Sequence, residues 1–202
     1  MLAKVHSAAV LGIDAYPIEI EVNSGWGQPQ VIIVGLPDAA VKESRDRVKT
    51  AIENSGFKFV VGRLTLNLAP VDVKKEGPNF DLPIAVGILA VREQIVAKDL
   101  DDYAIVGELA LSGEVRSVNG VLPIAICARD QKKRGLIVPA DNAVEAAVVQ
   151  GIDVYPAKNL REVAEFLAGK RNCNRFARIP PGFSRNNAVT MSISSMSKAR
   201  SM

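Results

Sequence analysis

The sequence predicts a mixed α/β fold in two layers, with helices packed on a sheet. Apolar and polar side chains alternate over residues 3–10 and 16–23, the period of a strand that buries one face. Apolar residues over 38–55 recur at helical spacing instead. The first half of the chain thus reads as three strands, a helix, a strand and a second helix, an order typical of a mixed sheet that carries helices.

The same periodicities place the remaining elements. An apolar run at 28–35 predicts the third strand, and clean alternation at 63–70 predicts the fourth. Residues 80–95 are apolar nearly all round, as expected of a central buried helix, and Pro83 is compatible with that helix because it falls in the first turn. Later strands are expected at 103–108, 112–118, 136–139 and 152–155, and later helices at 120–133, 142–150 and 159–168.

Capping residues mark several helix ends. Asp38 follows Gly35-Leu36-Pro37 and is expected to cap the first helix, which Gly56 is placed to end. Two later helices begin with the spacing of a capping box, formed by Asn142 with Glu145 and by Asn159 with Glu162.

The first helix is expected to be amphipathic. Val41, Val48 and Ile52 fall on one face and are predicted to be buried. The opposite face is charged, and its i,i+4 spacing predicts the ion pairs Lys42/Asp46 and Glu43/Arg47.

Charge divides the chain into a folded domain, 1–169, and a basic tail, 170–202. The tail lacks helical or strand periodicity and is rich in Ser, Asn and Arg, so it is predicted to be disordered. The domain carries 18 basic against 22 acidic residues, and a domain that gripped a duplex alone would be expected to show a basic stripe. The tail carries no acid and seven basic residues: Lys170, Arg171, Arg175, Arg178, Arg185, Lys198 and Arg200.

No nucleotide site is expected. The phosphate-binding pattern GxxxxGK[ST] does not occur, and the nearest segment, VIIVGLPDAAVKES, lacks its second glycine and its Lys-Ser pair. Asp38 would also place a negative charge where a phosphate would sit. The segment is interpreted as a strand-to-helix turn with a cap, and no cofactor is predicted.

Metal and membrane sites are not expected either. Cys127 and Cys173 are 46 positions apart and His6 is the single histidine, which is too few ligands for structural zinc. Cys127 lies in an apolar helical pattern and is predicted to be a buried, inert thiol. No run approaches the roughly 20 apolar residues of a membrane span, and a cytoplasmic location is expected.

Several long motifs resemble a known family. VIIVGLPDAAVKESRDRVKTAIENSGF, LNLAPVDVKKEGPNFDLPIAVGIL, GELALSGEVRSVNGVLPIA and LIVPADNAVEAA occur in the order found in the amino-terminal domain of the ComM/YifB magnesium-chelatase-like AAA+ proteins. This resemblance covers residues 1–168. Segments 74–90 and 106–129 also resemble the Lon-type protease domain. Both resemblances imply a ribosomal-protein-S5-domain-2-like fold.

The Lon-type protease domain uses a serine and a lysine, and both corresponding positions differ here. The serine position in the EGPNF turn is Asn79, and the lysine position after Gly120-Val121 is Leu122. A carboxamide does not form an acyl-enzyme and a leucine supplies no base, so no peptidase activity is predicted. Asn79 is instead expected to cap the helix that starts at Phe80, and Leu122 to pack inward. An unrecognised pair, Ser112 or Ser117 with Lys74 or Lys75, is the rival hydrolase hypothesis.

The resemblance implies a non-catalytic accessory domain. In the family this domain precedes an AAA+ motor that forms a hexameric ring and is linked to DNA processing in natural transformation. The motor does not follow here, so the chain is expected to be truncated relative to the family. The alternative is a stand-alone module that binds DNA weakly through its tail. Candidate contacts for either hypothesis are Lys132, Lys133, Arg134, Arg171, Arg175, Arg178 and Arg185.

Overall fold

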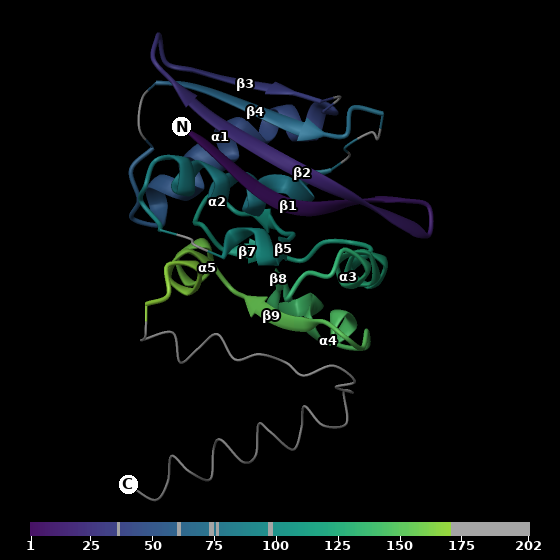
Figure 1. Ribbon diagram of the computed structural model, residues 1–202. Coiled ribbons are helices and arrows are strands. Elements are labelled where there is room, and N and C mark those ends of the chain that lie inside the picture. The colour runs from purple at the N-terminus through teal and green to yellow at the C-terminus, as the bar shows by residue number, and fades with distance from the viewer. Residues whose placement is uncertain (36, 60–61, 73–74, 76, 97–98, 171–202) are drawn as a thin grey trace, which may run out of the picture.

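A seven-stranded mixed sheet organises the protein in the computed structural model, which describes residues 1–35, 37–59, 62–72, 75, 77–96 and 99–170. The strand order is β3-β4-β2-β1-β5-β8-β9 (Figure 1). The strands are β1 Leu2–Leu11, β2 Asp14–Gly25, β3 Gln30–Val34, β4 Arg63–Ala69, β5 Tyr103–Ile105, β8 Gly135–Pro139 and β9 Asp153–Ala157. A separate ribbon pairs β6, Glu108–Leu109, with β7, Val115–Arg116. Five α-helices occur in the described part of the chain: α1 Ala39–Asn54, α2 Asp81–Val91, α3 Val121–Asp130, α4 Ala143–Ala146 and α5 Leu160–Leu167.

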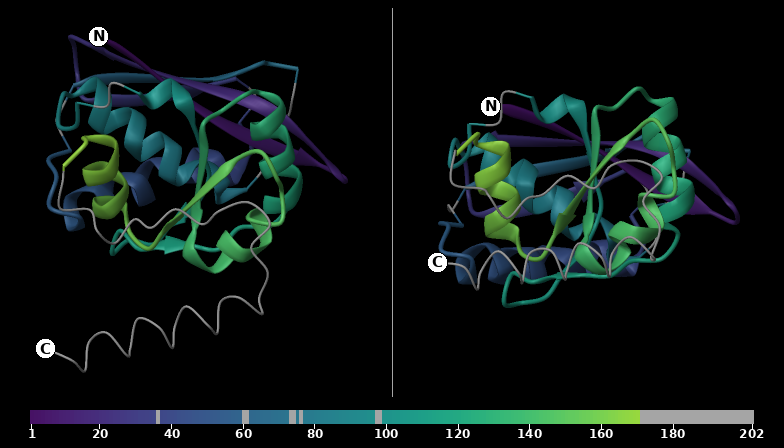
Figure 2. Two further views of the ribbon diagram at one scale, coloured as in Figure 1. Left: turned by 60° about the horizontal axis from the view of Figure 1, so that its bottom comes forward. Right: turned by 90° about the horizontal axis from the view of Figure 1, so that it is seen from below.

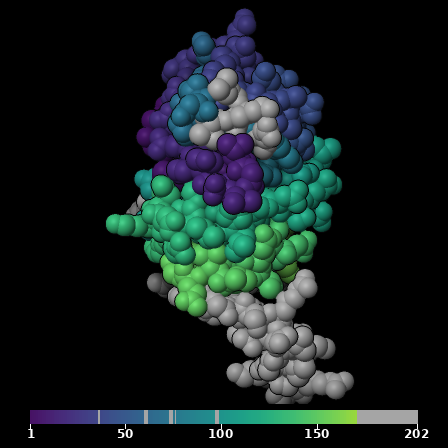
Figure 3. Space-filling view, turned by 90° about the vertical axis from the view of Figure 1, so that its right-hand side faces the viewer, coloured from purple at the N-terminus to yellow at the C-terminus, as the bar shows by residue number. Residues whose placement is uncertain are grey.

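Antiparallel pairing is confined to the centre of the sheet. β1 and β2 form a long hairpin whose register runs from Leu2 opposite Asn23 to Leu11 opposite Asp14. β4 pairs antiparallel with β2, whereas the β3–β4, β1–β5, β5–β8 and β8–β9 pairs are parallel. In Figure 3 the purple tip of the hairpin reaches the surface and borders the teal-green residues of the second half of the chain.

The expected two layers are present only at the β3-β4-β2 end of the sheet. Toward β9, alternate strand residues enter two different hydrophobic clusters, as Ala104 and Ile105 of β5 do. The first cluster contains α1, α2 and α5, and the second contains α3 and α4. Figure 2 shows these two sets of helices on either side of the green strands. Helices therefore cover both faces at this end, so the two-layer prediction is wrong there.

Local signals position α1 as predicted. The Asp38 carboxylate accepts a hydrogen bond from the Val41 amide at 2.8 Å. Gly56 follows the C-cap with a φ of +83°, a conformation that glycine adopts without a Cβ clash. The predicted residues of the inner face, Val41, Val48 and Ile52, are buried. The predicted ion pairs on the charged face are not formed, because Asp46 pairs with its neighbour Arg45 and Arg47 turns toward α2.

The central helix is α2, as its composition predicts. Ten of its eleven residues are buried, the exception being Ala90, and Pro83 lies in the first turn. Two of the predicted helices nevertheless end earlier than expected. α2 ends at Val91 just before Glu93, and α3 ends at Asp130 just before Lys132, both residues having a positive φ that ends a helix.

Asn142 does not act as the capping residue that its spacing suggests. Its side-chain oxygen accepts from the Val118 amide at 2.9 Å, and its side-chain nitrogen donates to the Val118 carbonyl at 3.0 Å. Because the carboxamide is used by this distant backbone, α4 has no side-chain cap and spans only four residues. Asn159, in contrast, caps α5 as predicted, by accepting from the Glu162 amide at 2.9 Å.

None of the helices in the described ranges is long and apolar enough to cross a membrane. The described residues end at 170, so the predicted disorder of the tail, together with Cys173, falls outside them.

The turn between β3 and α1 generates a stability prediction. Gly35 has a φ of +98°, and a Cβ there would lie 2.8 Å from the Leu68 carbonyl carbon and closer still to its oxygen. Gly35→Ala should therefore lower the free energy of unfolding by about 3 kcal/mol, because backbone strain and a clash with backbone combine. Gly12→Ala is the matched control, since Gly12 has a φ of +65° with nothing within 4 Å, and it should cost only about 1 kcal/mol. Urea unfolding of both variants measures the difference, and equal losses would contradict this account of the turn.

Candidate functional site

The Lon-type turn lies directly ahead of α2. Residues Pro78–Phe80 form a 3-10 turn, and the chain continues from it into α2. The Asn79 carbonyl accepts from the Gly107 amide at 3.0 Å, and the Leu82 amide donates to the Gly107 carbonyl at 3.0 Å. These two hydrogen bonds fix the turn against the segment that follows β5.

The predicted cap by Asn79 is wrong. The residue at the N-cap position of α2 is Phe80, and no side chain caps this helix. Asn79 falls inside the 3-10 turn, one residue too early to reach the first free amides of α2. A carboxamide therefore occupies the position that presents the serine in Lon-type domains.

The predicted inward packing of Leu122 is also wrong. Leu122 is 40% exposed, and its backbone amide donates to the Glu145 carboxylate at 3.0 Å. α3 buries a stripe formed by Val121, Ile124, Ala125 and Ala128, and Leu122 lies beside this stripe rather than on it. The position that corresponds to the Lon lysine therefore faces solvent and carries no amine.

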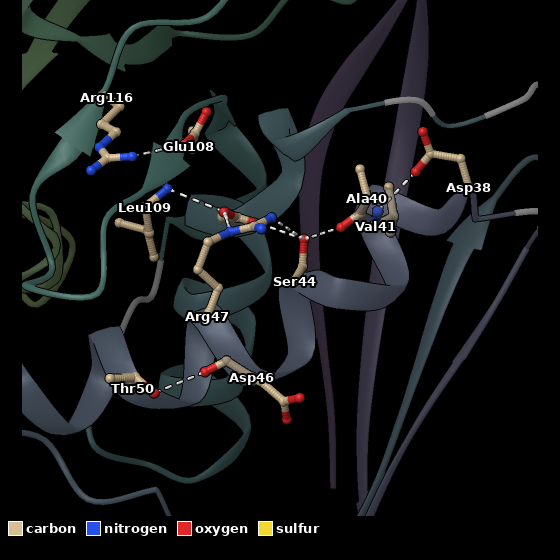
Figure 4. A network of polar contacts seen from close by, with 11 residues as sticks. Asp38, Ala40, Val41, Ser44, Asp46, Arg47, Thr50, Glu108, Leu109 and Arg116 are labelled. Carbon is tan, nitrogen blue, oxygen red and sulfur yellow. Dashed lines mark hydrogen bonds and ion pairs between the residues drawn. The ribbon is translucent and has the colours of Figure 1, made fainter.

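A buried carboxylate forms the main polar centre of this region. Asp81, the first residue of α2, is completely buried. Figure 4 shows Ser44, Arg47 and the Leu109 amide directed toward one carboxylate, which belongs to Asp81. Arg47 Nε donates to Oδ2 at 2.7 Å and its Nη2 donates to Oδ1 at 3.1 Å. The Ser44 hydroxyl donates to Oδ1, and the Leu109 amide donates to Oδ2 at 3.3 Å.

The environment of this carboxylate is that of a structural ion pair. The two-point contact with Arg47 is the arrangement that guanidinium and carboxylate groups favour. The hydrogen bond to Asp81 raises the pKa of Arg47 above its usual range. Both Asp81 oxygens accept hydrogen bonds from α1, and Oδ2 also accepts one from the β6 backbone, so the pair connects three elements.

Sequence reasoning missed this pair although a signal was present. Asp81 is the one charged residue in an otherwise apolar helix, and a charge buried among apolar residues requires a partner. Its partners lie 34 and 37 positions earlier on α1, at Arg47 and Ser44. The i,i+4 pattern instead assigned Arg47 to Glu43 on the same helix.

The serines and the lysine of the rival Ser–Lys hypothesis differ in exposure. Ser112 and Ser117 are exposed, and the Ser112 hydroxyl accepts from the Glu114 amide at 3.4 Å. Lys75 is fully buried and its amine donates to the Pro70 carbonyl, while burial lowers its pKa. Lys74 lies outside the described residues. The Lys75 amine is thus bound to a loop carbonyl, which does not favour the hydrolase hypothesis.

Two of the three basic residues that follow α3, Lys133 and Arg134, are engaged by the segment before β5. Lys133 Nζ donates to the Asp101 carbonyl at 2.6 Å. Arg134 pairs with Asp102 at 3.3 Å and Asp99 at 3.8 Å, and it stacks on Tyr103 at 4.8 Å. Lys132, the third member, lies in the turn after α3. The other predicted nucleic-acid contacts, Arg171, Arg175, Arg178 and Arg185, fall outside the described residues.

Neither the single histidine nor the described cysteine is among the hydrogen-bond partners of Asp81 given above. His6 Nε2 lies 3.3 Å from the Asp101 carboxylate, and burial, followed by the charge of Lys133, lowers its pKa. Cys127 is half-buried rather than fully buried, and burial raises the pKa of its thiol, which reduces its reactivity. Within the described ranges, no group of three or more His, Cys, Asp or Glu side chains could hold a metal ion.

The chain is similar in sequence to several known proteins. Residues 18–142 match the family described as subunit ChlI of Mg-chelatase. The chain is 47% identical over 169 residues to the competence protein ComM of Haemophilus influenzae, and 46% identical over 174 residues to the uncharacterized protein YifB of Salmonella typhimurium. These matches cover 84% and 86% of this chain but only 33% and 34% of the relatives, so the chain spans about a third of their length. Lon protease 2 of Bacillus subtilis is a distant relative, 23% identical over 165 residues, covering 73% of this chain and 29% of that protein.

The unequal burial of Asp81 and Arg47 predicts unequal effects of removing either partner. Arg47→Met leaves a carboxylate with no exposed surface unpaired, and should lower the free energy of unfolding by about 3–5 kcal/mol. Asp81→Asn leaves the guanidinium, which is 25% exposed, able to turn to water, and should cost less, about 2–3 kcal/mol.

Arg45→Met is the matched control, because Arg45 pairs with its exposed neighbour Asp46, and it should leave the stability essentially unchanged. Chemical unfolding followed by circular dichroism gives the three values. An Arg47→Met variant as stable as the control would contradict the central role assigned to this ion pair.

Proposed function

This chain belongs to the ChlI family of Mg-chelatase subunits and is similar to the amino-terminal third of ComM and YifB, and we propose that it is a non-catalytic accessory domain of a ComM-like AAA+ ATPase. It would act in the cytoplasm, in contact with its motor. Its fold is proposed to be of the ribosomal-protein-S5-domain-2 type, which the distant similarity to Lon protease supports.

This proposal rests on the residues that occupy the two positions of the Lon-type serine and lysine. Asn79 replaces the nucleophile inside a turn that Gly107 holds by backbone hydrogen bonds. Leu122 replaces the base and faces solvent. Two charged residues near this turn, Asp81 and Arg47, form an ion pair with each other. A scaffold role explains why the surrounding helices are held so firmly while the reactive groups are missing.

The comparisons support the accessory role in general terms. The similar proteins extend well beyond the length that this chain matches, and one of them is named a competence protein. We propose that the remaining two thirds of such proteins supply the ATPase motor, that the motor assembles as a hexamer, and that the domain serves DNA processing in natural transformation. The matched third contributes a folded surface for assembly.

The alternative is a nucleic-acid-binding module that acts through the basic tail. Residues 1–169 carry more acidic than basic residues. In the cluster after α3, Lys133 donates to the Asp101 backbone carbonyl and Arg134 pairs with the carboxylates of Asp99 and Asp102. The folded surface therefore offers little to a phosphate backbone. This alternative depends on the tail arginines.

The purified chain should show neither ATP hydrolysis nor peptidase activity. The double variant Asn79→Ser, Leu122→Lys should also be inactive, because a lysine at the exposed position 122 would stay fully protonated near neutral pH and could not serve as the base. Phosphate release and labelling with a fluorophosphonate probe measure the two activities. Labelling of Ser112 or Ser117 in the unmodified chain would support the rival hydrolase instead.

A chimera tests the accessory role directly. Residues 1–169 of this chain, placed in Haemophilus influenzae ComM instead of its own matched third, should preserve transformation, because the two segments share nearly half of their residues. ComM without that third is the matched control and should transform poorly. A chimera no better than this control would contradict the proposal, provided that immunoblotting shows equal amounts of both proteins.

A further inference from the structure

β3 is an edge strand of the seven-stranded sheet. Among the described residues β3 pairs with β4 alone, and it forms the outermost strand at the top of Figure 1. Four of its five residues, Val31 to Val34, are β-branched and apolar, and Val34 is 42% exposed. Each alternate residue of an edge strand directs its N–H and C=O away from the sheet, and such an edge is a template for a further strand.

A charged stripe on α1 runs alongside this edge. Lys42, Asp46, Lys49 and Glu53 are all exposed, and their spacing of four, three and four residues places them on one face of the helix. A groove brings three of them, Asp46, Lys49 and Glu53, beside Gln30, Val31 and Phe59. Lys49 Nζ also lies 6.0 Å from the centre of the Phe59 ring. The stripe therefore faces the same side of the molecule as the β3 edge.

The charges along this stripe alternate between positive and negative. A second copy of the stripe, running in the opposite direction, therefore presents the opposite charge at each position. When two copies of α1 lie antiparallel, Lys42 of one copy faces Glu53 of the other, and Asp46 of one faces Lys49 of the other. Each of these two contacts occurs twice by symmetry, which gives four attractive contacts. An antiparallel β3–β3 pair centred on Ile32 would use the same two-fold symmetry, opposing Val31 and Ile33. α1 is the crossover helix between the parallel strands β3 and β4, so it runs antiparallel to β3. A single two-fold axis perpendicular to both elements can therefore relate the two copies of β3 and the two copies of α1.

We infer that the occupant of this edge is a second copy of the chain, paired through β3 and the α1 stripe as a two-fold dimer. The β3 strands supply main-chain hydrogen bonds, and the charged stripe selects the antiparallel register. This interface involves neither the Asp81 ion pair nor the turn that contains Asn79, so it is independent of the proposed accessory role.

The mass of the intact 202-residue chain, measured by sedimentation velocity over a concentration series, tests the inference. The mass should rise from 21.6 kDa toward twice that value as concentration increases. Asp46→Lys and Lys49→Glu should each raise the dimer Kd at least about tenfold, because each reversal turns two attractions into two repulsions. Glu43→Lys is the matched control: it makes the same charge change as Asp46→Lys but lies away from the stripe on α1, and it should dimerise like the unmodified chain.

Mixing the two charge variants gives the decisive result. An equimolar mixture of Asp46→Lys and Lys49→Glu restores both attractions in a heterodimer, so it should associate about as tightly as the unmodified chain. A chain that stays monomeric at high concentration overturns the inference, and it would leave the edge to a strand from a different partner. Single variants that dimerise normally, or a mixture that does not recover, overturn it as well.

Discussion

The burial of Asp81 is the constraint on which the rest of this structure depends. A carboxylate with no exposed surface is tolerated in a protein interior only when its oxygens are bound. Arg47 and Ser44 must therefore come from α1, and the Leu109 amide from β6, which fixes both elements against the start of α2. The carboxylate sits beside the turn that would be catalytic in a protease, and here it holds that turn in place.

Contacts around this ion pair join the two halves of the chain. The Asn54 side chain at the end of α1 donates to the Leu111 carbonyl at 2.7 Å. Arg161 of α5 donates to the Ser55 carbonyl at 2.8 and 3.1 Å, which satisfies a backbone acceptor at the end of α1. Helix α1 thus donates hydrogen bonds to α2 and to the loop after β6, and its C-cap Ser55 accepts hydrogen bonds from α5. This convergence of contacts fixes the position of α1 relative to both halves of the chain.

Signals that act within a few residues could be predicted from the sequence, and signals that depend on distant partners could not. Asp38, Gly56 and Asn159 act on backbone groups three or four positions away, and all three occur as expected. Arg47 and Asn142 also had plausible local partners, but in the fold their partners lie 34 and 24 positions away. The apolar character of Leu122 predicts a buried side chain, but the buried residues of α3 form a stripe beside Leu122. In the site, the residue types at positions 79 and 122 are given by the sequence itself, whereas the Asp81–Arg47 ion pair depends on the packing of α1 on α2.

The position of β1 in the sheet has a consequence for the order in which the chain can fold. β1 precedes the other strands of the sheet in the sequence, yet it lies in the interior of the sheet between β2 and β5, and its His6 pairs with Ala104. The hairpin with β2 can form early, but the other side of β1 waits for about a hundred further residues. Pairing across such a separation is slow, because a long loop must close before the contact forms. During synthesis, one edge of β1 therefore remains open until β5 emerges, and a chaperone or a neighbouring chain has its best access to the protein in that interval.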